Sequence, residues 1–210
     1  MPKLILASRS PRRRSLLHSL GVEFEVQIAN VDETPLPGES PTAMVERLSR
    51  LKAAAVAAVS PGSVVVAADT VVVLDDKILG KPIDVDEART MLMALRGRMH
   101  QVHTAVTVRR DDRSITEIST SHVTMRAYSP GQLEAYLATG DPLDKAGAYA
   151  IQHPAFAPVK RWEGCYTSIM GLPLGLTERL LNAVGLITLG HAVLACRLLT
   201  GERCCLDARR

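Results

Sequence analysis

The chain has 210 residues, of which 47% are hydrophobic and 22% charged, and its formal net charge at pH 7 is +3. This length and apolar fraction are enough to bury a sizeable core, which excludes a disordered chain and predicts one domain that can have two lobes. The small net charge and the 3% of aromatic residues argue against a general nucleic-acid binder, and they favour a small acidic ligand.

The first predicted strand leads directly into a helix. Leu4–Ala7 is a short apolar run typical of a buried strand, and a Ser-Pro pair predicts a capped helix from Pro11 to about Leu20. Such a junction directs unpaired backbone N–H groups toward the carboxyl edge of the strand, which favours an anion site over a solvated basic turn. The hydroxyl and guanidinium groups expected at this edge are those of Ser8, Arg9, Arg12 and Arg13.

Two adjacent carboxylates follow the second predicted strand, Glu23–Ala29. Asp32 and Glu33 open a loop rich in proline and glycine, where they have either a metal- or ligand-binding role or the role of a solvated turn. The next helix begins at another Ser-Pro cap and ends near Val59. Lys52 falls within its apolar stripe, so its ammonium group either extends to the rim or contacts an anion held at the end of the first strand.

A core strand is predicted over Ser63–Leu74, a β-branched run that is interrupted by Asp69 and Thr70. Burying a carboxylate is costly unless it is paired, hydrogen-bonded or bound to metal, so Asp69 is expected to be functional. A turn and a short return strand follow. A rigid loop, Gly80–Pro82, then presents Lys81 beside the same hairpin.

The middle of the chain is interpreted as scaffold. A helix that starts at Asp84 and stops at Gly97 begins with the Asp-x-x-Glu spacing of a capping box. An alternating strand with His100 and His103, a partner strand Ile115–Tyr128 that is a candidate sheet edge, and a helix Pro130–Thr139 follow. Because residues three apart in a strand face opposite sides, the two histidines are not expected to chelate a metal together.

The last third of the chain contains a ligand-loop candidate and an apolar helical region. Asp141–Gln152 combines small residues with polar side chains, as expected where backbone approaches a ligand, although a tight structural loop has the same composition. Leu180–Leu199 is apolar enough for a membrane span, but polar residues and glycines interrupt it, which favours buried or paired helices. The four cysteines lack C-x-x-C spacing and follow no secretory signal, so we expect reduced thiols, a cytoplasmic location and no zinc site.

Five motifs resemble, in order and spacing, those of the Maf family of nucleoside-triphosphate pyrophosphatases over about residues 4–180. They are Ser8–Arg13, Ala68–Thr70, Gly80–Pro82, Asp144–Gln152 and Gly171–Leu174. The resemblance implies a single α/β domain over residues 1–210, with residues 181–210 as a C-terminal helical tail. It implies two lobes, a central mixed β-sheet flanked by helices like that of inosine-triphosphate pyrophosphatases, and an active site in the cleft between the lobes.

The resemblance also implies a reaction and residue roles. The reaction is hydrolysis of a nucleoside triphosphate to the monophosphate and pyrophosphate with a divalent cation, Mg²⁺ or Mn²⁺. Asp69 matches the general base, and Glu33, together with Asp69, matches the acidic metal-binding position. The phosphate ligands are Arg13, Lys52 and Lys81, which Ser8 joins at the anion site. No nucleic-acid or membrane partner is implied, and a homodimer is left open.

Substrate choice is expected to depend on Arg12, Thr70 and Gln152. These residues match the branch of the family that acts on dTTP and UTP, with clearance of non-standard pyrimidine nucleotides as one role. The alternatives are a 7-methyl-GTP pyrophosphatase and a non-enzymatic binding protein in septum formation or division arrest. Residues 153–163 replace a glycine-rich turn found in many relatives, so the shape of that loop is left open.

Overall fold

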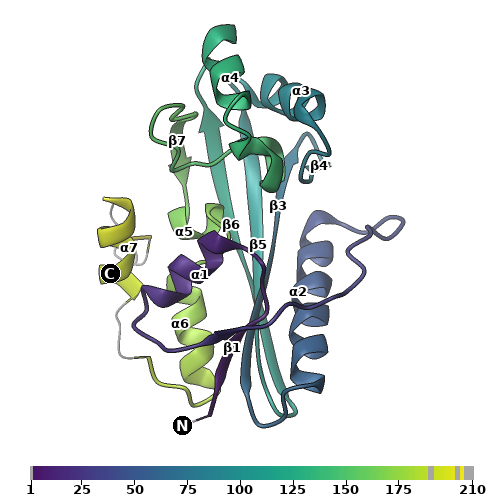
Figure 1. Cartoon of the computed structure of the whole chain (residues 1–210), viewed down its shortest axis with the longest axis vertical. Helices are drawn as coiled ribbons and strands as arrows, with labels where there is room; N and C mark the ends of the chain where they lie inside the picture. Colours follow the sequence, from purple (N-terminus) through teal and green to yellow (C-terminus); the bar gives the residue numbers. More distant parts are fainter. Residues whose placement is uncertain (1, 189–191, 202–203, 206–210) are drawn as a thin grey trace.

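A seven-stranded mixed sheet forms the centre of the protein. The computed structural model describes residues 2–188, 192–201 and 204–205 (Figure 1). The sheet order is β2-β1-β3-β5-β6-β7, with β4 paired to β3; β1 is parallel to β2 and β3, and the other pairs are antiparallel. The strands are β1 Leu4–Leu6, β2 Glu25–Val26, β3 Val64–Leu74, β4 Lys77–Leu79, β5 Met99–Arg110, β6 Arg113–Met125 and β7 Val159–Glu163.

Helices cover both faces of the sheet. They are α1 Pro11–His18, α2 Pro41–Ala58, α3 Val85–Leu95, α4 Pro130–Leu137, α5 Tyr166–Ile169, α6 Leu174–Ala183 and α7 Ala192–Thr200, with the 3₁₀ turns η1 Asp141–Asp144 and η2 Ala146–Ala148. The predicted caps Ser10, Ser40 and Asp84 are confirmed, and Ser129 caps α4 in the same way. The side chain of each accepts a hydrogen bond from a first-turn backbone N–H.

The alternation of side chains between the two faces of the sheet explains why the central strands β1 and β3 have apolar residues on both faces. In β1 and β3, Leu6 and Val66 pack with α1 and α6, whereas Ile5 and Val65 pack against α2 on the opposite face. Since both faces are covered, no polar alternation is needed. The long strands β3, β5 and β6 continue into a second apolar cluster with α3 and α4, which gives the two lobes seen in Figure 1. The predicted α/β class with a mixed sheet is therefore confirmed.

At the sheet margins, two predicted elements differ from the structure, and one strand was not predicted. The second strand has only two paired residues, Glu25 and Val26, and both are exposed. The strand β6 is not an edge, because β7 pairs with it on its free side. The strand β7 lies within the loop 153–163 and was not predicted, since its exposed and half-buried residues follow no apolar alternation.

The apolar C-terminal region contains two helices in place of a single long one. The helix α6 ends at Ala183 and α7 begins at Ala192, with Gly185 at a φ of 79° after the end of α6. In the ranges given above, no helix is long and apolar enough to cross a membrane. The interpretation as packed helices is confirmed by α6 and α7, which contribute Leu180 and Ala195 to the same core cluster.

Candidate active site

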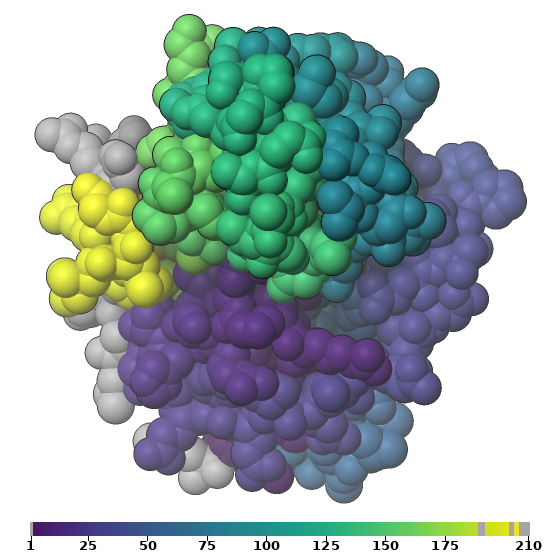
Figure 2. Space-filling model, turned by 45° about the horizontal axis from the view of Figure 1, so that its top comes forward, coloured from purple at the N-terminus to yellow at the C-terminus, as the bar shows by residue number. Residues whose placement is uncertain are grey.

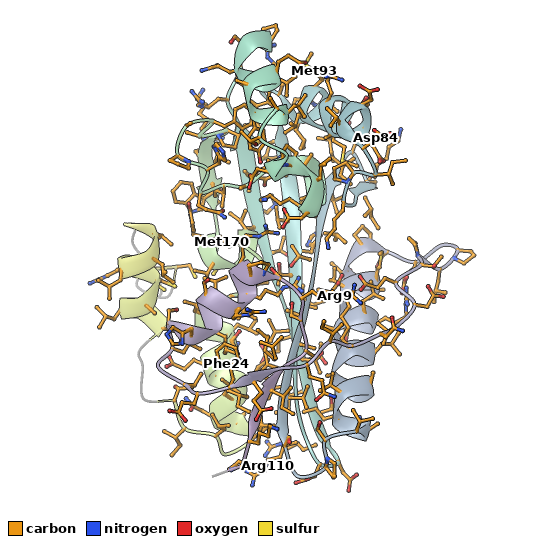
Figure 3. The ribbon with its side chains drawn as sticks, in the orientation of Figure 1. Arg9, Phe24, Asp84, Met93, Arg110 and Met170 are labelled. Carbon is orange, nitrogen blue, oxygen red and sulfur yellow. The ribbon has the colours of Figure 1, made fainter. Side chains whose placement is uncertain are left out.

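A cleft of about 860 Å³ opens between the two lobes. Figure 2 shows the purple N-terminal segment bordering the green residues of the other lobe, and Figure 3 shows Arg9 and Met170 at the level where the lobes meet. All nine predicted site residues line this cleft: Ser8, Arg12, Arg13, Glu33, Lys52, Asp69, Thr70, Lys81 and Gln152. Residues distant in sequence are thus brought to one place, and the volume is suitable for a nucleotide.

Alternation along β3 divides the site between two helices. Asp69 lies on the same face of the strand as Ala67, toward α2, whereas Thr70 lies on the face of Ala68, toward α1. The carboxylate of Asp69 therefore meets the lysine of α2, and the hydroxyl of Thr70 meets the arginine of α1. This is the structural reason why Asp and Thr interrupt an otherwise apolar strand.

On the α2 side, one ammonium group joins two carboxylates. Lys52 Nζ lies 2.7 Å from Asp69 Oδ1 and 3.0 Å from Glu33 Oε2. Lys52 and Asp69 are only 8% and 7% exposed, so the first ion pair is buried, while Glu33 reaches in from an exposed loop. The ammonium does not extend to the rim: it contacts the two acidic groups at the floor of the cleft. Burial of a charged pair requires such mutual compensation.

On the α1 side, Arg13 joins three segments. Its guanidinium donates to Ala68 O at 2.7 Å, to Thr70 Oγ1 at 3.0 Å and to Gly171 O at 2.8 Å. Burial lowers the pKa of Arg13, although nearby Asp69 and Glu33 act to raise it, and an arginine stays charged under these conditions. Three of its five N–H groups thus bond to atoms of β3 and of the α5–α6 loop, which holds the guanidinium in place at the cleft.

Gly171 has little room for a side chain. Its φ is 111°, and a Cβ built on it would lie 3.3 Å from Arg13 Nε and 3.5 Å from Thr70 Oγ1. The glycine therefore allows the backbone carbonyl to approach the guanidinium closely. This explains, in physical terms, why a glycine stands at the start of the Gly171–Leu174 motif.

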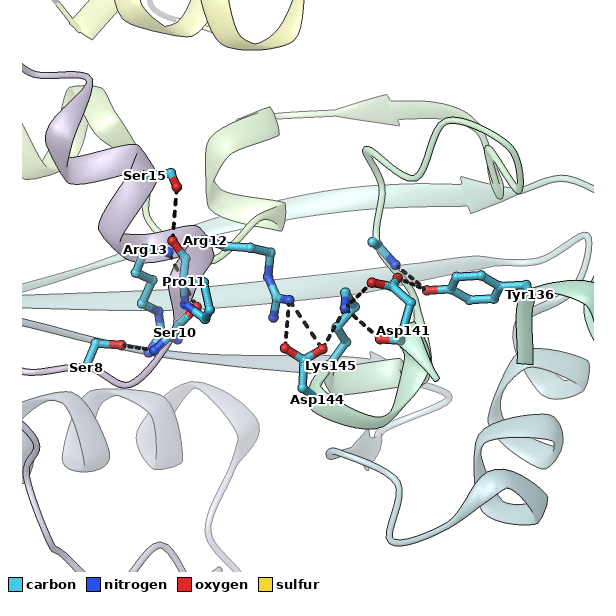
Figure 4. Close-up of polar contacts among 11 residues, drawn as sticks. Ser8, Ser10, Pro11, Arg12, Arg13, Ser15, Tyr136, Asp141, Asp144 and Lys145 are labelled. Atoms are coloured by element: carbon cyan, nitrogen blue, oxygen red, sulfur yellow. Dashed lines mark hydrogen bonds and ion pairs between the residues drawn. The ribbon is translucent and has the colours of Figure 1, made fainter. Parts of the chain in front are cut away.

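A polar network connects the lobes across the cleft (Figure 4). Arg12 Nη1 lies 3.3 Å from Asp144 Oδ2, and Lys145 Nζ lies 2.6 Å from Asp144 Oδ1 and 2.8 Å from Asp141 Oδ1. Tyr136 donates its hydroxyl to Asp141 Oδ2 at 2.8 Å. Burial is the largest single effect and acts to raise the pKa of both aspartates, but the Lys145 hydrogen bond, together with the Tyr136 hydroxyl at Asp141 and the Arg12 charge at Asp144, outweighs it, so both pKa values are lowered.

Lys145 is a cleft residue to which the sequence analysis gave no role. It is buried, and its ammonium group is held by two carboxylates beside the cleft. The feature of the sequence that could have indicated a role for Lys145 is its position as a lysine among small residues in the Asp144–Gln152 motif. Ser8 is also buried and accepts a hydrogen bond from Ser10 N at 3.2 Å, whereas Lys81 and Gln152 are exposed at the cleft.

The charge of the cleft suits a polyanion. Six cationic side chains line it, against three carboxylates. The cations are Arg9, Arg12, Arg13, Lys52, Lys81 and Lys145, and the carboxylates are Glu33, Asp69 and Asp144. A concave surface with excess positive charge concentrates anionic ligands.

Asp69 and Glu33 fit a hard divalent cation as a partial ligand set. Their carboxylates approach the same ammonium group, so their oxygens face one small region of the cleft. Within the described residues, no group of three or more His, Cys, Asp or Glu side chains could hold a metal ion. Mg²⁺ commonly takes one or two carboxylates and completes its shell with water and substrate phosphates, so two carboxylates are sufficient here.

The two histidines of β5 are not among the residues that line the cleft. His100 Nε2 is 2.8 Å from the hydroxyl of Tyr149, and His103 Nδ1 is 2.9 Å from Thr120 Oγ1. The two side chains thus have different partners on opposite faces of the strand, as their spacing predicts. Burial lowers the pKa of His100 to about 4.

Comparisons with known proteins agree on one family. Residues 3–184 match the family described as "Maf-like protein". A protein of Thermomicrobium roseum named dTTP/UTP pyrophosphatase is 50% identical over 87% of this chain and 84% of its own length. Proteins of the same name from Pelotomaculum thermopropionicum and Myxococcus xanthus are 45% and 48% identical, covering 88% and 87% of this chain and 98% and 93% of their own lengths.

Two solved structures are similar to part of the fold. A HAM1 protein from Coxiella burnetii has a TM-score of 0.41 at 17% identity and covers 61% of this chain and 75% of that one. A structure titled "Nucleoside-triphosphatase / dITP/XTP pyrophosphatase", from Mycobacterium abscessus, has a TM-score of 0.41 at 16% identity and covers 60% and 75%.

Proposed function

The chain belongs to the Maf family, and on that premise we propose that it hydrolyses dTTP and UTP to the nucleoside monophosphate and pyrophosphate. The observation that carries the proposal is the buried Asp69–Lys52 pair, with Glu33 beside it, at the floor of a cleft lined by cations. The names of the relatives at 45–50% identity support the same reaction. A cytoplasmic location suits such a substrate and is part of the proposal.

Asp69 is proposed as the general base. Water attack on the α-phosphorus requires a group that takes the proton of the attacking water, and a carboxylate near the phosphate can do so. Lys52 donates to one carboxylate oxygen, which holds the group in a fixed orientation. A purely binding role in septum formation would not need a buried carboxylate at this point, so the pair favours an enzyme over a non-enzymatic binder.

The cationic side chains are proposed to stabilise the triphosphate and the departing pyrophosphate. Phosphoryl transfer depends largely on positioning and on neutralising negative charge, which Arg13, Lys52 and Lys81 can provide from three different elements. Ser8 can add a hydroxyl at the same end of β1. Glu33 and Asp69 would hold Mg²⁺ or Mn²⁺, which when bound neutralises phosphate charge as a Lewis acid.

Base selection is proposed to depend on Arg12, Thr70 and Gln152. A neutral pyrimidine has a carbonyl–imide–carbonyl edge, which a guanidinium donor and an amide can match. A 7-methylguanine is cationic, and an arginine in the same cleft would repel it. Thr70 contributes indirectly as well, because its hydroxyl accepts from Arg13 and is 3.0 Å from Thr104 Oγ1.

The test is a comparison of kcat/KM for dTTP, UTP, CTP and 7-methyl-GTP, measured as pyrophosphate release. We expect dTTP and UTP to be preferred by wild type. The variant Arg12→Trp/Thr70→Gln/Gln152→Glu is expected to lose that preference. Wild-type preference for 7-methyl-GTP would overturn the substrate assignment, an unchanged ranking in the variant would overturn the role of the three residues, and absence of pyrophosphate release would overturn the enzymatic proposal.

A further inference from the structure

Gln152, the amide proposed to contact the base, lies in a tight turn at the cleft. The turn spans Ala150–His153 and is closed by a hydrogen bond of 3.2 Å from His153 N to Ala150 O. Gln152 itself is exposed at the cleft. An amide has both a donor and an acceptor, so a freely turning glutamine can pair with thymine or, turned over, with cytosine. Selection by Gln152 therefore requires that the turn be held in one place.

The hydroxyl of Tyr136, on α4, holds the first residue of this turn. Its oxygen accepts a hydrogen bond of 3.2 Å from Ala150 N, and its O–H donates to Asp141 Oδ2 at 2.8 Å (Figure 4). The other oxygen of the Asp141 carboxylate is paired with Lys145 at 2.8 Å. The ionised carboxylate fixes the direction of the Tyr136 proton, which leaves a lone pair of the hydroxyl oxygen for Ala150 N–H.

The ring of Tyr136 contacts the last residue of the same turn. The ring of His153 is nearly perpendicular to it, at an interplanar angle of 72° and with the centroids 4.8 Å apart. Phe156 stacks on Tyr136 with centroids 4.2 Å apart, and its backbone N–H donates to His153 Nδ1 at 3.0 Å. One side chain thus contacts both ends of the turn, with its hydroxyl at Ala150 and its ring at His153.

Tyr136 lies behind the cleft surface. It is 2% exposed and is not among the residues that line the cleft. Burial, together with the hydrogen bond to Asp141, raises the pKa of Tyr136, so its hydroxyl keeps its proton at neutral pH and can donate and accept at once. Its effect on a bound nucleotide therefore passes through the turn.

We propose that Tyr136 is a positioning residue for base selection, because it holds the Ala150–His153 turn so that the Gln152 amide meets the pyrimidine in one orientation. This inference rests on the proposed role of Gln152 and adds to it a residue of the opposite lobe. Loss of the hydroxyl leaves the buried Ala150 N–H without its acceptor and allows the turn to shift. A displacement of about 1 Å in a binding group can lower kcat/KM by about 10²-fold.

Tyr128 provides the matched control. It is 1% exposed, belongs to the same apolar cluster as Tyr136 and also contacts the ring of Phe156, with centroids 4.8 Å apart. Its hydroxyl donates to Leu92 O in α3. Tyr136→Phe and Tyr128→Phe thus each remove one buried hydroxyl, and we expect both to lower Tm by about 2 to 6 °C. A difference in base selection between them is then not an effect of stability.

The kinetic test compares kcat/KM for dTTP and CTP, measured as pyrophosphate release, in wild type and in both variants. We expect Tyr136→Phe to reduce the preference for dTTP about 10-fold, mainly through a higher KM for dTTP, and Tyr128→Phe to keep it. The double variant Tyr136→Phe/Gln152→Ala is expected to have the same preference as Gln152→Ala, because Tyr136 acts through Gln152.

Amide hydrogen exchange at Ala150, followed by NMR without nucleotide, tests the contact independently of the reaction. We expect exchange of this N–H to be faster in Tyr136→Phe than in Tyr128→Phe, since only the first variant removes its acceptor.

Four outcomes would overturn the inference while leaving the proposed function in place. They are an unchanged preference in Tyr136→Phe, an equal loss in Tyr128→Phe, additive effects of Tyr136→Phe and Gln152→Ala, and equal exchange of the Ala150 N–H in the two tyrosine variants. A wild-type protein that releases no pyrophosphate, or that does not prefer dTTP to CTP, would overturn the proposed function, and the role of Tyr136 in base selection with it. The wild-type measurement alone therefore distinguishes the two failures.

Discussion

At the residue scale, the site depends on compensation between buried charges. Asp69 and Lys52 are each nearly enclosed, and either one alone would be an unpaired buried charge. A variant that removes the charge and keeps the shape therefore separates chemistry from folding. Asparagine is suitable at position 69, because its amide oxygen can still accept the hydrogen bond of Lys52.

We expect Asp69→Asn to lower kcat by about 10²-fold to 10⁴-fold, since an amide cannot take the proton of the attacking water. Its Tm is expected to stay near that of wild type, because Lys52 keeps the carboxylate of Glu33, at 3.0 Å, as a partner. Asp75→Asn is the matched control, because Asp75 lies in the turn after the same strand, outside the cleft, in an exposed ion pair with Arg98. Pyrophosphate release and thermal melting measure both effects, and a near-normal kcat in Asp69→Asn would exclude it as the base.

The side chain of His100 is 3% exposed, and its Nδ1 has no hydrogen-bond partner among the residues that the structure describes. Burial lowers its pKa from 6.5 to about 4, so it stays neutral in the folded protein at pH values where the unfolded chain takes up a proton. The unfolded state therefore binds more protons between these two pKa values, and stability falls as pH falls.

Between pH 7 and pH 5 the free energy of unfolding of wild type is expected to fall by roughly 2 kcal/mol more than that of His100→Gln. Glutamine cannot be protonated in this range, and its amide can still contact Tyr149. Urea denaturation at several pH values measures the difference in the free energy of unfolding between wild type and His100→Gln. Both proteins have the same carboxylates, so the contributions of these groups cancel in the difference. Parallel pH profiles would show that His100 does not titrate differently in the two states.

At the element scale, the sequence predicts β3 well and the sheet margins poorly. Both faces of β3 are buried, so its composition alone marks it, and the same burial makes Asp69 conspicuous. The strands β2 and β7 are short and largely exposed, so they form through pairing with β1 and β6 and not through an apolar pattern. The local hydrophobic pattern of the sequence thus predicts the buried strands, whereas the exposed strands are determined by pairing with a neighbouring strand.

Gly171 lies in the turn after α5, where its backbone carbonyl accepts a hydrogen bond from Arg13. Gly171→Ala is expected to lower kcat/KM by about 10-fold to 10²-fold, because the added methyl pushes against Arg13 and shifts its guanidinium. Gly38→Ala is the matched control: its φ is also positive, at 72°, but no atom of the described residues lies within 4 Å of its Cβ position. The Gly38→Ala control is expected to lose stability and to keep the kcat/KM of wild type. If Gly171→Ala and Gly38→Ala have the same kcat/KM, the glycine at position 171 is not needed to position Arg13.

At the scale of the whole molecule, the lobes meet through contacts that no local pattern predicts. Arg12 and Asp144 are 132 residues apart, and their pairing depends on how α1 and η1 are carried to opposite sides of the cleft. The sequence motifs include both residues but do not indicate that they touch. The pair is partly exposed, with Asp144 at 58%, so it adds little stability and can exchange for a ligand.

An anionic substrate must compete with Asp144 for Arg12. We therefore expect Asp144→Asn to lower KM for dTTP about 2-fold to 10-fold at low ionic strength, with kcat little changed, and we expect the gain to shrink as salt screens the cleft. Asp141→Asn is the control, because Asp141 also holds Lys145 but has no bond to Arg12. A rise of KM in Asp144→Asn alone would mean that the aspartate orients Arg12 for the substrate, and the cleft would then be organised by this contact before the nucleotide arrives.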